Sequence, residues 1–302
     1  MTTRAALIVN PQAGKGHGLS AATTAAAVLR GAGVITEIHI PANQAQTVDM
    51  SKAAVDSGTD AVIACGGDGT VHTVIQAVAQ TPCAFGLIPT GTGDDNARTL
   101  GLPRHDPVAS ARVILDTLVS PRVIDLARAT TSGSTGQDVS RWFIGVLSTG
   151  FDSTVNERAN SMKWPKGHAR YNLAILAELR TFRPIKYQVT IDDQLIEANG
   201  MLVSIGNGAN YGGGMIVCPD AILDDGLLDL TWLHEISTAR FLKVFPTVYK
   251  GAHVRNRAVQ TFRGKHITVS ARGQIAYADG ERLGPLPVSI EVIPGALRVL
   301  AP

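Results

Sequence analysis

Three glycines surround an aspartate and precede a threonine in the segment at residues 66–70, which reads GGDGT. The segment lies between a short apolar run at residues 61–65 and a run with helical spacing at residues 71–79. Glycines let a chain turn sharply and expose its N–H groups, and a helix N-terminus adds partial positive charge. Phosphate oxygens bind well at such a place. A purely structural turn would need fewer glycines, so this segment predicts a phosphate-binding loop.

Two further glycine-rich segments follow apolar runs in the same way. Residues 10–16 read NPQAGKG after the run at 5–9, and residues 89–96 read PTGTGDDN after the run at 84–88. Loops that follow parallel strands share the carboxyl edge of the sheet, where ligands of α/β proteins bind. Three loops therefore converge on one predicted nucleotide site. Neither segment matches a P-loop, because Lys15 precedes a glycine, and none of the three is a clean GxGxxG.

The first 126 residues alternate strand-like and helix-like segments, which predicts a mainly parallel sheet with helices on its faces. The predicted strands are residues 5–9, 34–40, 61–65 and 84–88, and the predicted helices are residues 20–30, 47–57, 71–79 and 108–118.

The alternation of strand-like and helix-like segments ends near Asp125, and residues 130–138 have the composition of a loop. Strand patterns then predominate, at residues 141–147, 187–191, 201–205, 227–233, 266–271 and 288–293, with predicted helices at 171–181 and 239–250. We expect an α/β domain at residues 1–126, to which residues 294–302 return, and a β-rich domain at residues 127–293.

Composition narrows the class of protein. The 302 residues carry a formal net charge of only +2 and no long basic run, so nucleic acid is not an expected partner. The three cysteines lie far apart, which is typical of a reducing compartment. No apolar run is long enough to span a bilayer, and the run at residues 5–9 is too short for a signal peptide. We therefore expect a cytoplasmic protein.

Taken together, GGDGT, NPQAGKG and PTGTGDDNAR at residues 89–98 resemble the diacylglycerol kinase catalytic domain family, which includes bacterial soluble lipid kinases, sphingosine kinases and ceramide kinases. Later landmarks extend the resemblance over nearly the whole chain: GFD at 150–152, the glycine-rich stretch at 207–214, Asp225-Gly226 and DGE at 279–281. The resemblance implies an N-terminal α/β nucleotide-binding domain, similar to those of NAD kinase and 6-phosphofructokinase. It implies a β-rich C-terminal sandwich domain.

The resemblance further implies that ATP and Mg²⁺ are the cofactors, with Asp68 placing the catalytic ion. The nucleotide contacts that it implies are Asn10, Pro11, Gln12, Ala13, Gly14, Gly66, Gly67, Asp68, Gly69, Thr70, Val71, His72, Thr73, Gly91 and Thr92. Helical spacing alone favours a surface position for His72.

The third loop departs from the family pattern GTxNDFAR. Asp95 takes the place of the family aspartate, whereas Asp94 replaces an asparagine and Asn96 replaces an apolar or aromatic residue. We expect Asp95 and Arg98 to face the substrate, and the extra carboxylate to alter contacts with the metal or the lipid headgroup.

A hydroxyl that attacks a γ-phosphate must lose its proton, and a carboxylate within hydrogen-bond reach can accept it. The resemblance places this base in DGE, where we favour Asp279 and keep Glu281 as the alternative. Asp-Gly is also a common hairpin signal, so an ordinary turn is the other interpretation.

Several bacterial members carry a structural Mg²⁺ near the second Asp-Gly pair. The resemblance implies that Asp225 and the backbone carbonyls of Ile222 and Leu227 bind it, with Asp125 and Lys163 linked to the site. Asp224 is an alternative ligand, and a plain turn is the other interpretation. Hard oxygen ligands of this kind suit Mg²⁺.

The resulting prediction is an ATP- and Mg²⁺-dependent kinase that phosphorylates diacylglycerol to phosphatidic acid. It would visit the membrane surface peripherally, and it is compatible with a homodimer. Three alternatives remain: a kinase of another lipid alcohol (a sphingoid base, ceramide or a glycolipid), an NAD kinase, and a nucleotide-sensing module without catalysis.

Overall fold

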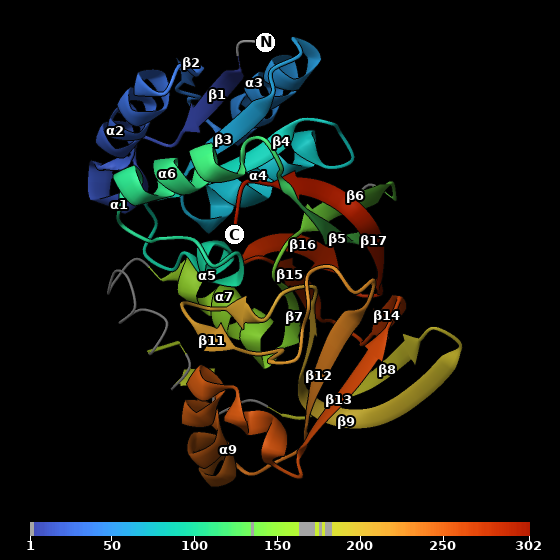
Figure 1. Cartoon of the computed structure of the whole chain (residues 1–302). Coiled ribbons are helices and arrows are strands. Elements are labelled where there is room, and N and C mark those ends of the chain that lie inside the picture. Colours follow the sequence, from blue (N-terminus) through green and yellow to red (C-terminus); the bar gives the residue numbers. More distant parts are fainter. Residues whose placement is uncertain (1–2, 134–135, 163–172, 175–176, 179–182) are drawn as a thin grey trace.

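The computed structural model describes residues 3–133, 136–162, 173–174, 177–178 and 183–302 of the chain. Figure 1 shows an α/β part at the top and a β-rich part below it, with the C-terminus between the two. None of the helices in the described ranges is both long and apolar enough to cross a membrane.

The α/β part contains a parallel sheet in the order β4-β3-β1-β2. Its strands are β1 (Arg4–Val9), β2 (Ile35–His39), β3 (Ala61–Gly66) and β4 (Ala84–Pro89). Its longer helices are α2 (Gly18–Gly31), α3 (Gln44–Asp56), α4 (Asp68–Val78) and α6 (Pro107–Thr117), and its short helices are α1 (Ala13–Gly16) and α5 (Asp95–Thr99). Apolar side chains of α2 and α6 pack on one face of the sheet and those of α4 on the other. The predicted alternation of strands and helices is confirmed.

The β-rich part is built from antiparallel pairs around a second apolar core, which includes Tyr187 and Trp232. Its strands are β5 (Arg122–Ser132), β6 (Asp138–Phe143), β7 (Val146–Gly150), β8 (Ile185–Ile191), β9 (Gln194–Gly206), β12 (Leu228–His234), β13 (Val259–Gly264), β14 (His266–Ser270), β15 (Ile275–Ala278), β16 (Glu281–Pro285) and β17 (Val288–Val299), with a small ribbon of β10 (Asn210–Tyr211) and β11 (Met215–Ile216). Its helical elements are α7 (Phe151–Ser161), α9 (Thr238–Val244), η1 (Phe245–Lys250) and η2 (Ala252–Arg255). The expected α/β and β-rich fold class is confirmed.

Strand β17 joins the two parts. Its first half pairs antiparallel with β14 and β5, and its register with β5 shifts between Ile293 and Leu297. Beyond that shift, Arg298 and Val299 pair in parallel with β4, at the edge of the α/β sheet. Gly295 lies in the bend with φ +63°, a left-handed value that suits glycine. The domain boundaries at residues 126 and 293 stay predictions, and β5 and β17 run through them.

Asp125 fixes this junction. Its carboxylate accepts hydrogen bonds from the N–H of Gly226 and the N–H of Gly295, both at 2.8 Å. Its own N–H donates to the carbonyl of Leu223, and its carbonyl accepts from Nδ2 of Asn207. All of its polar groups are therefore bonded to three distant segments. Because Asp125 is only 5% exposed, water cannot replace these partners.

Three local predictions were wrong in detail. The loop expected at residues 130–138 is shorter, because β5 continues to Ser132 in pairing with β6. The strand expected at residues 141–147 is two strands, which are interrupted at Ile144 and Gly145. The helix expected at residues 239–250 changes from α to 3₁₀ geometry at Phe245, next to Pro246, which lacks a backbone N–H. Most of the helix expected at residues 171–181 lies outside the described residues.

Because Asp125 bonds segments of both parts, we predict that Asp125→Ala has a large effect on the stability of the protein. The substitution leaves the N–H groups of Gly226 and Gly295 without the acceptor of their part-buried hydrogen bonds, and the loss of such an acceptor costs up to about 1–3 kcal/mol per donor. We expect the free energy of unfolding, measured by urea denaturation, to fall by roughly 2–5 kcal/mol, and Asp125→Asn, which keeps one acceptor oxygen, to lose less.

Asp116→Ala, at an exposed position of α6, is the matched control. We expect its stability to stay within about 0.5 kcal/mol of the wild type. Equal stabilities of the Asp125 and Asp116 variants would show that the junction does not depend on this carboxylate.

Candidate active site

A cleft of about 940 Å³ lies between the α/β part and the β-rich part. From the α/β part come residues of all three glycine-rich loops, and from the β-rich part come residues of α7, the β10–β11 ribbon and the β15–β16 turn. The lining residues predicted from the sequence are Asn10, Gln12, Ala13, Gly14, Gly67, Asp68, Gly69, Thr70, Thr73, Gly91, Thr92, Asp95, Asp279 and Glu281. Positions spread over most of the chain thus meet in one cavity.

The glycine-rich loops touch one another through backbone atoms. A Cβ on Gly14, which has φ +60°, would lie 2.5 Å from the carbonyl oxygen of Thr90. A Cβ on Gly91 would lie 2.7 Å from Cα of Gly67. Real Cβ atoms do not approach other atoms this closely, so any larger residue would force the loops apart. The close contact keeps the N-terminus of α4 open to the cleft.

Helix α4 begins at the bottom of the cleft. Gly67 is its N-cap residue, and the carbonyl of Gly67 accepts from the N–H groups of Thr70 and Val71. Gly67, Asp68, Gly69 and Thr70 all line the cleft. The partial positive charge of a helix N-terminus therefore faces the cavity, as an anion site requires.

Four of the expected nucleotide contacts do not line the cleft. Val71 and His72 are buried in the packing of α4, and Pro11 and Gly66 are absent from the lining. The expectation that His72 is a surface residue was wrong: it is 4% exposed, because α3 and β6 both pack against α4. Burial disfavours the imidazolium form and lowers the pKa of His72 to about 4, with Arg141 acting in the same direction.

Both carboxylates of the third loop accept hydrogen bonds from backbone N–H groups, and only Asp95 also lines the cavity. Asp94, in left-handed conformation with φ +51°, is buried, and its Oδ1 accepts from the N–H of Gly91 at 2.9 Å. Burial and then the charge of Asp68 raise the pKa of Asp94. Asp94 is absent from the cleft lining. The expected change in metal or headgroup contacts is therefore wrong for the carboxylate of Asp94, which shapes the loop.

Asn96 and Asp95 tie this loop to its neighbours. Oδ1 of Asp68 accepts from the N–H of Asn96 at 2.9 Å and from its Nδ2 at 3.3 Å. The carboxylate of Asp95 accepts from the N–H groups of Gly213 and Gly214, each at 2.7 Å. Arg98, which we expected to face the substrate, instead lies beside Asp95, with Nε 3.8 Å from Oδ1, and does not line the cleft.

Asp279 and Gly280 form the turn between β15 and β16, with φ +48° and +83°. Both oxygens of the Asp279 carboxylate accept backbone hydrogen bonds, Oδ2 from Ile144 and Oδ1 from Gly145 and Val146, at 2.9–3.1 Å. Burial raises the pKa of Asp279 to about 7, although these bonds act in the opposite direction. The DGE segment is thus both a hairpin turn and part of the cleft wall.

The carboxylate of Glu281 differs from that of Asp279 in its contacts. Glu281 is partly buried, it lines the cleft, and among the described residues none forms a hydrogen bond with its carboxylate. Its Oε1 would lie 2.8 Å from a Cβ on Gly69, so the carboxylate reaches the first turn of α4. Burial raises the pKa of Glu281. Of the two acidic residues in DGE, Glu281 is the one with oxygens available to a ligand.

An apolar cavity of about 50 Å³, here called the apolar slot, adjoins the cleft. Asp152, Met215 and Phe245 line both cavities. The residues that line the slot are Asp152, Leu202, Met215, Val217, Thr231, Leu233, Phe241, Val244, Phe245, Val248, His253 and Val259.

Sequence reasoning did not assign Asp152 to the site and treated GFD as a turn landmark only. Burial raises the pKa of Asp152 to about 7. The sequence did contain a signal that could have pointed to Asp152: it follows Phe151 at the start of a helix. A carboxylate at such a position can lie among apolar side chains, as Asp152 does in the slot.

The expected structural Mg²⁺ site does not fit the residues around Asp225. Oδ2 of Asp225 pairs with the guanidinium of Arg263, and Oδ1 accepts from the N–H of Leu227 at 3.0 Å. Asp224 pairs with Arg122 at 3.1 Å, and half of the Ile222 surface is exposed. Within the described residues, no group of three acidic, histidine or cysteine side chains could hold a metal ion. Cationic side chains already neutralise these carboxylates. Lys163 lies outside the described residues.

Two family models cover nearly all of the chain. Residues 4–129 match the diacylglycerol kinase catalytic domain, and residues 145–301 match the YegS C-terminal NAD kinase beta sandwich-like domain. A diacylglycerol kinase of Mycobacterium tuberculosis is 41% identical over 296 residues, which cover 98% of this chain and 94% of the relative. A diacylglycerol kinase of Bacillus subtilis is 27% identical, over 94% of this chain and 91% of the relative.

Solved structures show the same fold. A diacylglycerol kinase from Bacillus anthracis superposes with a TM-score of 0.72 at 22% identity, over 99% of this chain and 97% of the other. Yeast NADH kinase superposes with a TM-score of 0.53 at 11% identity, over 97% and 80% of the two chains. These likenesses confirm the expected relation to the NAD kinase fold. By both family models and the 41% relative, the chain belongs to the diacylglycerol kinase catalytic domain family and is a lipid kinase of that family.

Proposed function

We propose that this protein transfers the γ-phosphoryl group of ATP to the free hydroxyl of diacylglycerol, which gives phosphatidic acid. The observation that carries the proposal is the cleft itself. Glycine-rich loops at a helix N-terminus and the carboxylate of Glu281, which has no hydrogen-bond partner among the described residues, line one cavity that adjoins an apolar slot. The relative with 41% identity is a diacylglycerol kinase, which supports this lipid among the alternatives.

The residues of the cleft fit a nucleotide. Cβ atoms on Gly14, Gly67 and Gly91 would fill the space between the loops, so only glycine leaves backbone N–H groups open to phosphates there. Mg²⁺ usually keeps one or two protein carboxylates as ligands and takes the rest from phosphates and water. We assign this role to Asp68, and its position in the first turn of α4 and in the cleft lining supports the assignment. When bound, the ion neutralises phosphate charge and polarises the transferred group.

Glu281 is the better candidate for the base. The substrate hydroxyl attacks the γ-phosphorus, the bond to the ADP oxygen breaks, and the hydroxyl proton must pass to an acceptor. Asp279 has both oxygens engaged by backbone N–H groups, so proton transfer to it would weaken the charge-assisted bonds that hold the wall of the cleft. Glu281 can accept the proton without such a loss. We therefore assign Asp279 to positioning the DGE turn and Glu281 to proton transfer.

A direct assay tests the function. Purified protein receives γ-labelled ATP with Mg²⁺ and mixed micelles that contain diacylglycerol, sphingosine or ceramide, with NAD in a parallel reaction. Label in phosphatidic acid supports the proposal. Label in another lipid would replace the substrate, and label in NADP would replace lipid kinase activity with NAD kinase activity. Tight ATP binding without transfer to any acceptor would support a nucleotide-sensing module.

Replacing Glu281, the proposed base, should change both kcat and the pH dependence of kcat/KM. A general base acts in its ionised form, so kcat/KM rises with pH through the pKa of the base and then levels off. Because burial raises the pKa of Glu281, this rise lies above the ordinary pH range of a glutamate. We expect Glu281→Gln to lower kcat by about 10²–10⁴-fold, to abolish the rise and to leave ATP affinity unchanged.

Asp279→Asn is the comparison variant. Its amide can accept at one oxygen but places an NH₂ group toward backbone donors, so we expect a lower melting temperature and reduced activity with the pH-dependent rise retained. If Asp279→Asn removes the rise while Glu281→Gln keeps it, the two roles must be exchanged.

The contact between loops predicts that Gly91→Ala weakens ATP binding. A Cβ there would lie 2.5 Å from Oδ1 of Asp94 and 2.7 Å from Cα of Gly67, so the loop must move away from the N-terminus of α4. We expect Kd for ATP, measured by calorimetry, to rise at least about tenfold, which corresponds to roughly 1.4 kcal/mol.

Gly31→Ala is the control, because a Cβ on this helix-end glycine would meet nothing within 4 Å. We expect unchanged ATP affinity and a free energy of unfolding that is higher by about 0.5–1 kcal/mol. Equal affinities of the two variants would contradict the proposed contact of ATP with the paired glycine loops.

A further inference from the structure

Positive charge is concentrated in one stretch of a chain whose formal net charge is only +2. Residues 236–257, here called the basic lobe, contain five basic residues and no acidic one: Arg240, Lys243, Lys250, Arg255 and Arg257. The last acidic residue before the lobe is Glu235, and the next one along the chain is Asp279. The rest of the chain therefore carries more acidic than basic residues. The net charge of the lobe is positive, whereas that of the rest of the chain is negative.

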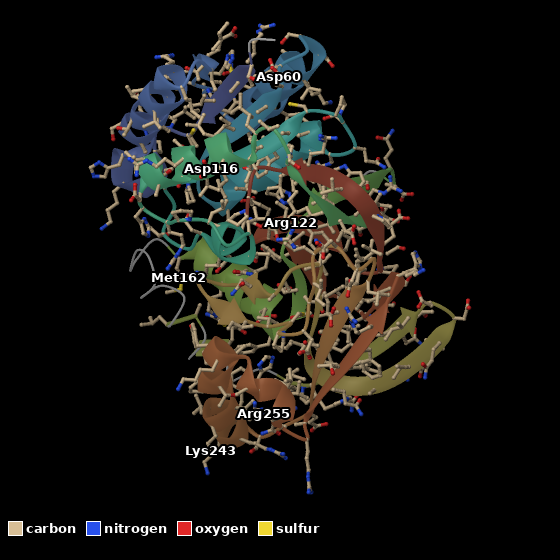
Figure 2. The ribbon with its side chains drawn as sticks, in the orientation of Figure 1. Asp60, Asp116, Arg122, Met162, Lys243 and Arg255 are labelled. Atoms are coloured by element: carbon tan, nitrogen blue, oxygen red, sulfur yellow. The ribbon has the colours of Figure 1, made fainter. Side chains whose placement is uncertain are left out.

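The structure gathers these charges on one projecting surface. The basic lobe consists mainly of α9, η1 and η2, which form the end of the molecule opposite the α/β part (Figure 1). All five basic residues are exposed. Figure 2 shows Lys243 and Arg255 at this same end, far from the α/β sheet.

The lobe has an apolar side as well as a charged one. Phe241, Val244, Phe245 and Val248 point inward and line the apolar slot. Leu242 and Tyr249 are each 50% exposed and lie among the basic side chains along α9 and η1. Exposed apolar side chains surrounded by cations are the pattern of a segment that lies in the interface of an anionic bilayer.

We propose that the basic lobe docks this protein on anionic lipid bilayers, with Leu242 and Tyr249 entering the headgroup boundary. The inference rests on the proposed function and names the surface through which the lipid is approached. Charge complementarity attracts the lobe to acidic headgroups, and the two apolar side chains add contact that salt does not screen. Tyr249 and Phe245 also line the catalytic cleft, so the docked surface continues into the site.

This geometry favours a bilayer over nucleic acid as the partner. Nucleic-acid surfaces use cations along a groove and aromatic rings for stacking, without an adjoining aliphatic cavity. Here the cations surround an exposed leucine, and directly beneath them lies a slot lined largely by apolar side chains, such as Leu202 and Val244. An acyl chain that leaves the bilayer at this surface meets apolar side chains from the membrane boundary to the cleft.

Vesicle binding by the full-length protein tests the surface without reference to catalysis. Sedimentation with phosphatidylcholine vesicles, with and without phosphatidylglycerol, compares the wild type with the triple variant Lys243→Gln, Lys250→Gln and Arg255→Gln. Each cation near an anionic leaflet strengthens binding about fivefold, so we expect the triple variant to bind about 100-fold more weakly to the anionic vesicles. High salt should weaken wild-type binding and have little effect on the variant.

A control triple variant carries Lys52→Gln, Arg112→Gln and Arg272→Gln. These exposed residues lie on α3, on α6 and after β14, so the change in net charge is the same at other places. We expect it to bind like the wild type. Leu242→Ser should weaken the part of the binding that persists at high salt. Equal binding of both triple variants would overturn the proposal, and so would wild-type affinity for a short RNA or DNA duplex as high as that for anionic vesicles.

Kinase assays separate this inference from the proposed function. With a short-chain diacylglycerol that dissolves without vesicles, we expect the lobe variant to keep wild-type turnover, because the three substituted residues lie outside the cleft lining. With diacylglycerol in anionic vesicles, its activity should fall in parallel with binding. Normal, lobe-dependent vesicle binding by a protein that phosphorylates no lipid would overturn the proposed substrate and leave the docking surface standing.

Discussion

A continuous path of hydrogen bonds connects the junction of the two parts to the wall of the cleft. Asp125 holds the bend of β17 and the loop before β12, and its carbonyl accepts from Nδ2 of Asn207. The same Nδ2 group donates to the carbonyl of Ile144, and the N–H of Asn207 donates to the carbonyl of Gly145. The N–H groups of Ile144 and Gly145 in turn donate to Asp279. The position of the DGE turn therefore depends on the same buried residues that hold the two parts together.

The cleft concentrates negative charge, and Asp279 at the end of this path is one of several close carboxylates. Asp68 raises the pKa of Asp94, Asp95 and Asp279, in addition to the larger effect of burial on each. Such a group of carboxylates is unfavourable unless each has donors, and backbone N–H groups of three separate segments supply them: the third loop, the loop at Gly213 and the loop at Gly145. Only a rigid arrangement keeps those donors in place. Glu281 stands outside this set, and so its protonation can change without loss of a structural bond.

Local sequence features predicted the elements and the glycine loops well, because both depend on short-range rules. Spacing of apolar residues gave β3 and α4, and the need for close backbone approach identified Gly67 and Gly91. Non-local contacts limited the other predictions. The surface position expected for His72 failed because β6, from the β-rich part, covers a helix face that spacing alone leaves free. The metal site expected at Asp225 stays a prediction that the sequence alone could not weigh, because Arg263, 38 positions later on β13, pairs with this carboxylate.

The two parts of the chain divide the work of substrate recognition. Everything that suits a nucleotide lies on the α/β part, where glycine loops and a helix N-terminus expose polar backbone. The features that suit a lipid lie on the β-rich part: the apolar slot, Asp152 at its mouth, and the basic lobe that covers it. The two sets meet at the DGE turn, which β15 and β16 extend toward α4, and at Asp95, which accepts from the N–H groups of Gly213 and Gly214. On the proposed function, the acceptor side is carried by side chains of α7, α9 and η1 rather than by the glycine loops, so a change of acceptor lipid would require no change in the phosphate-binding loops.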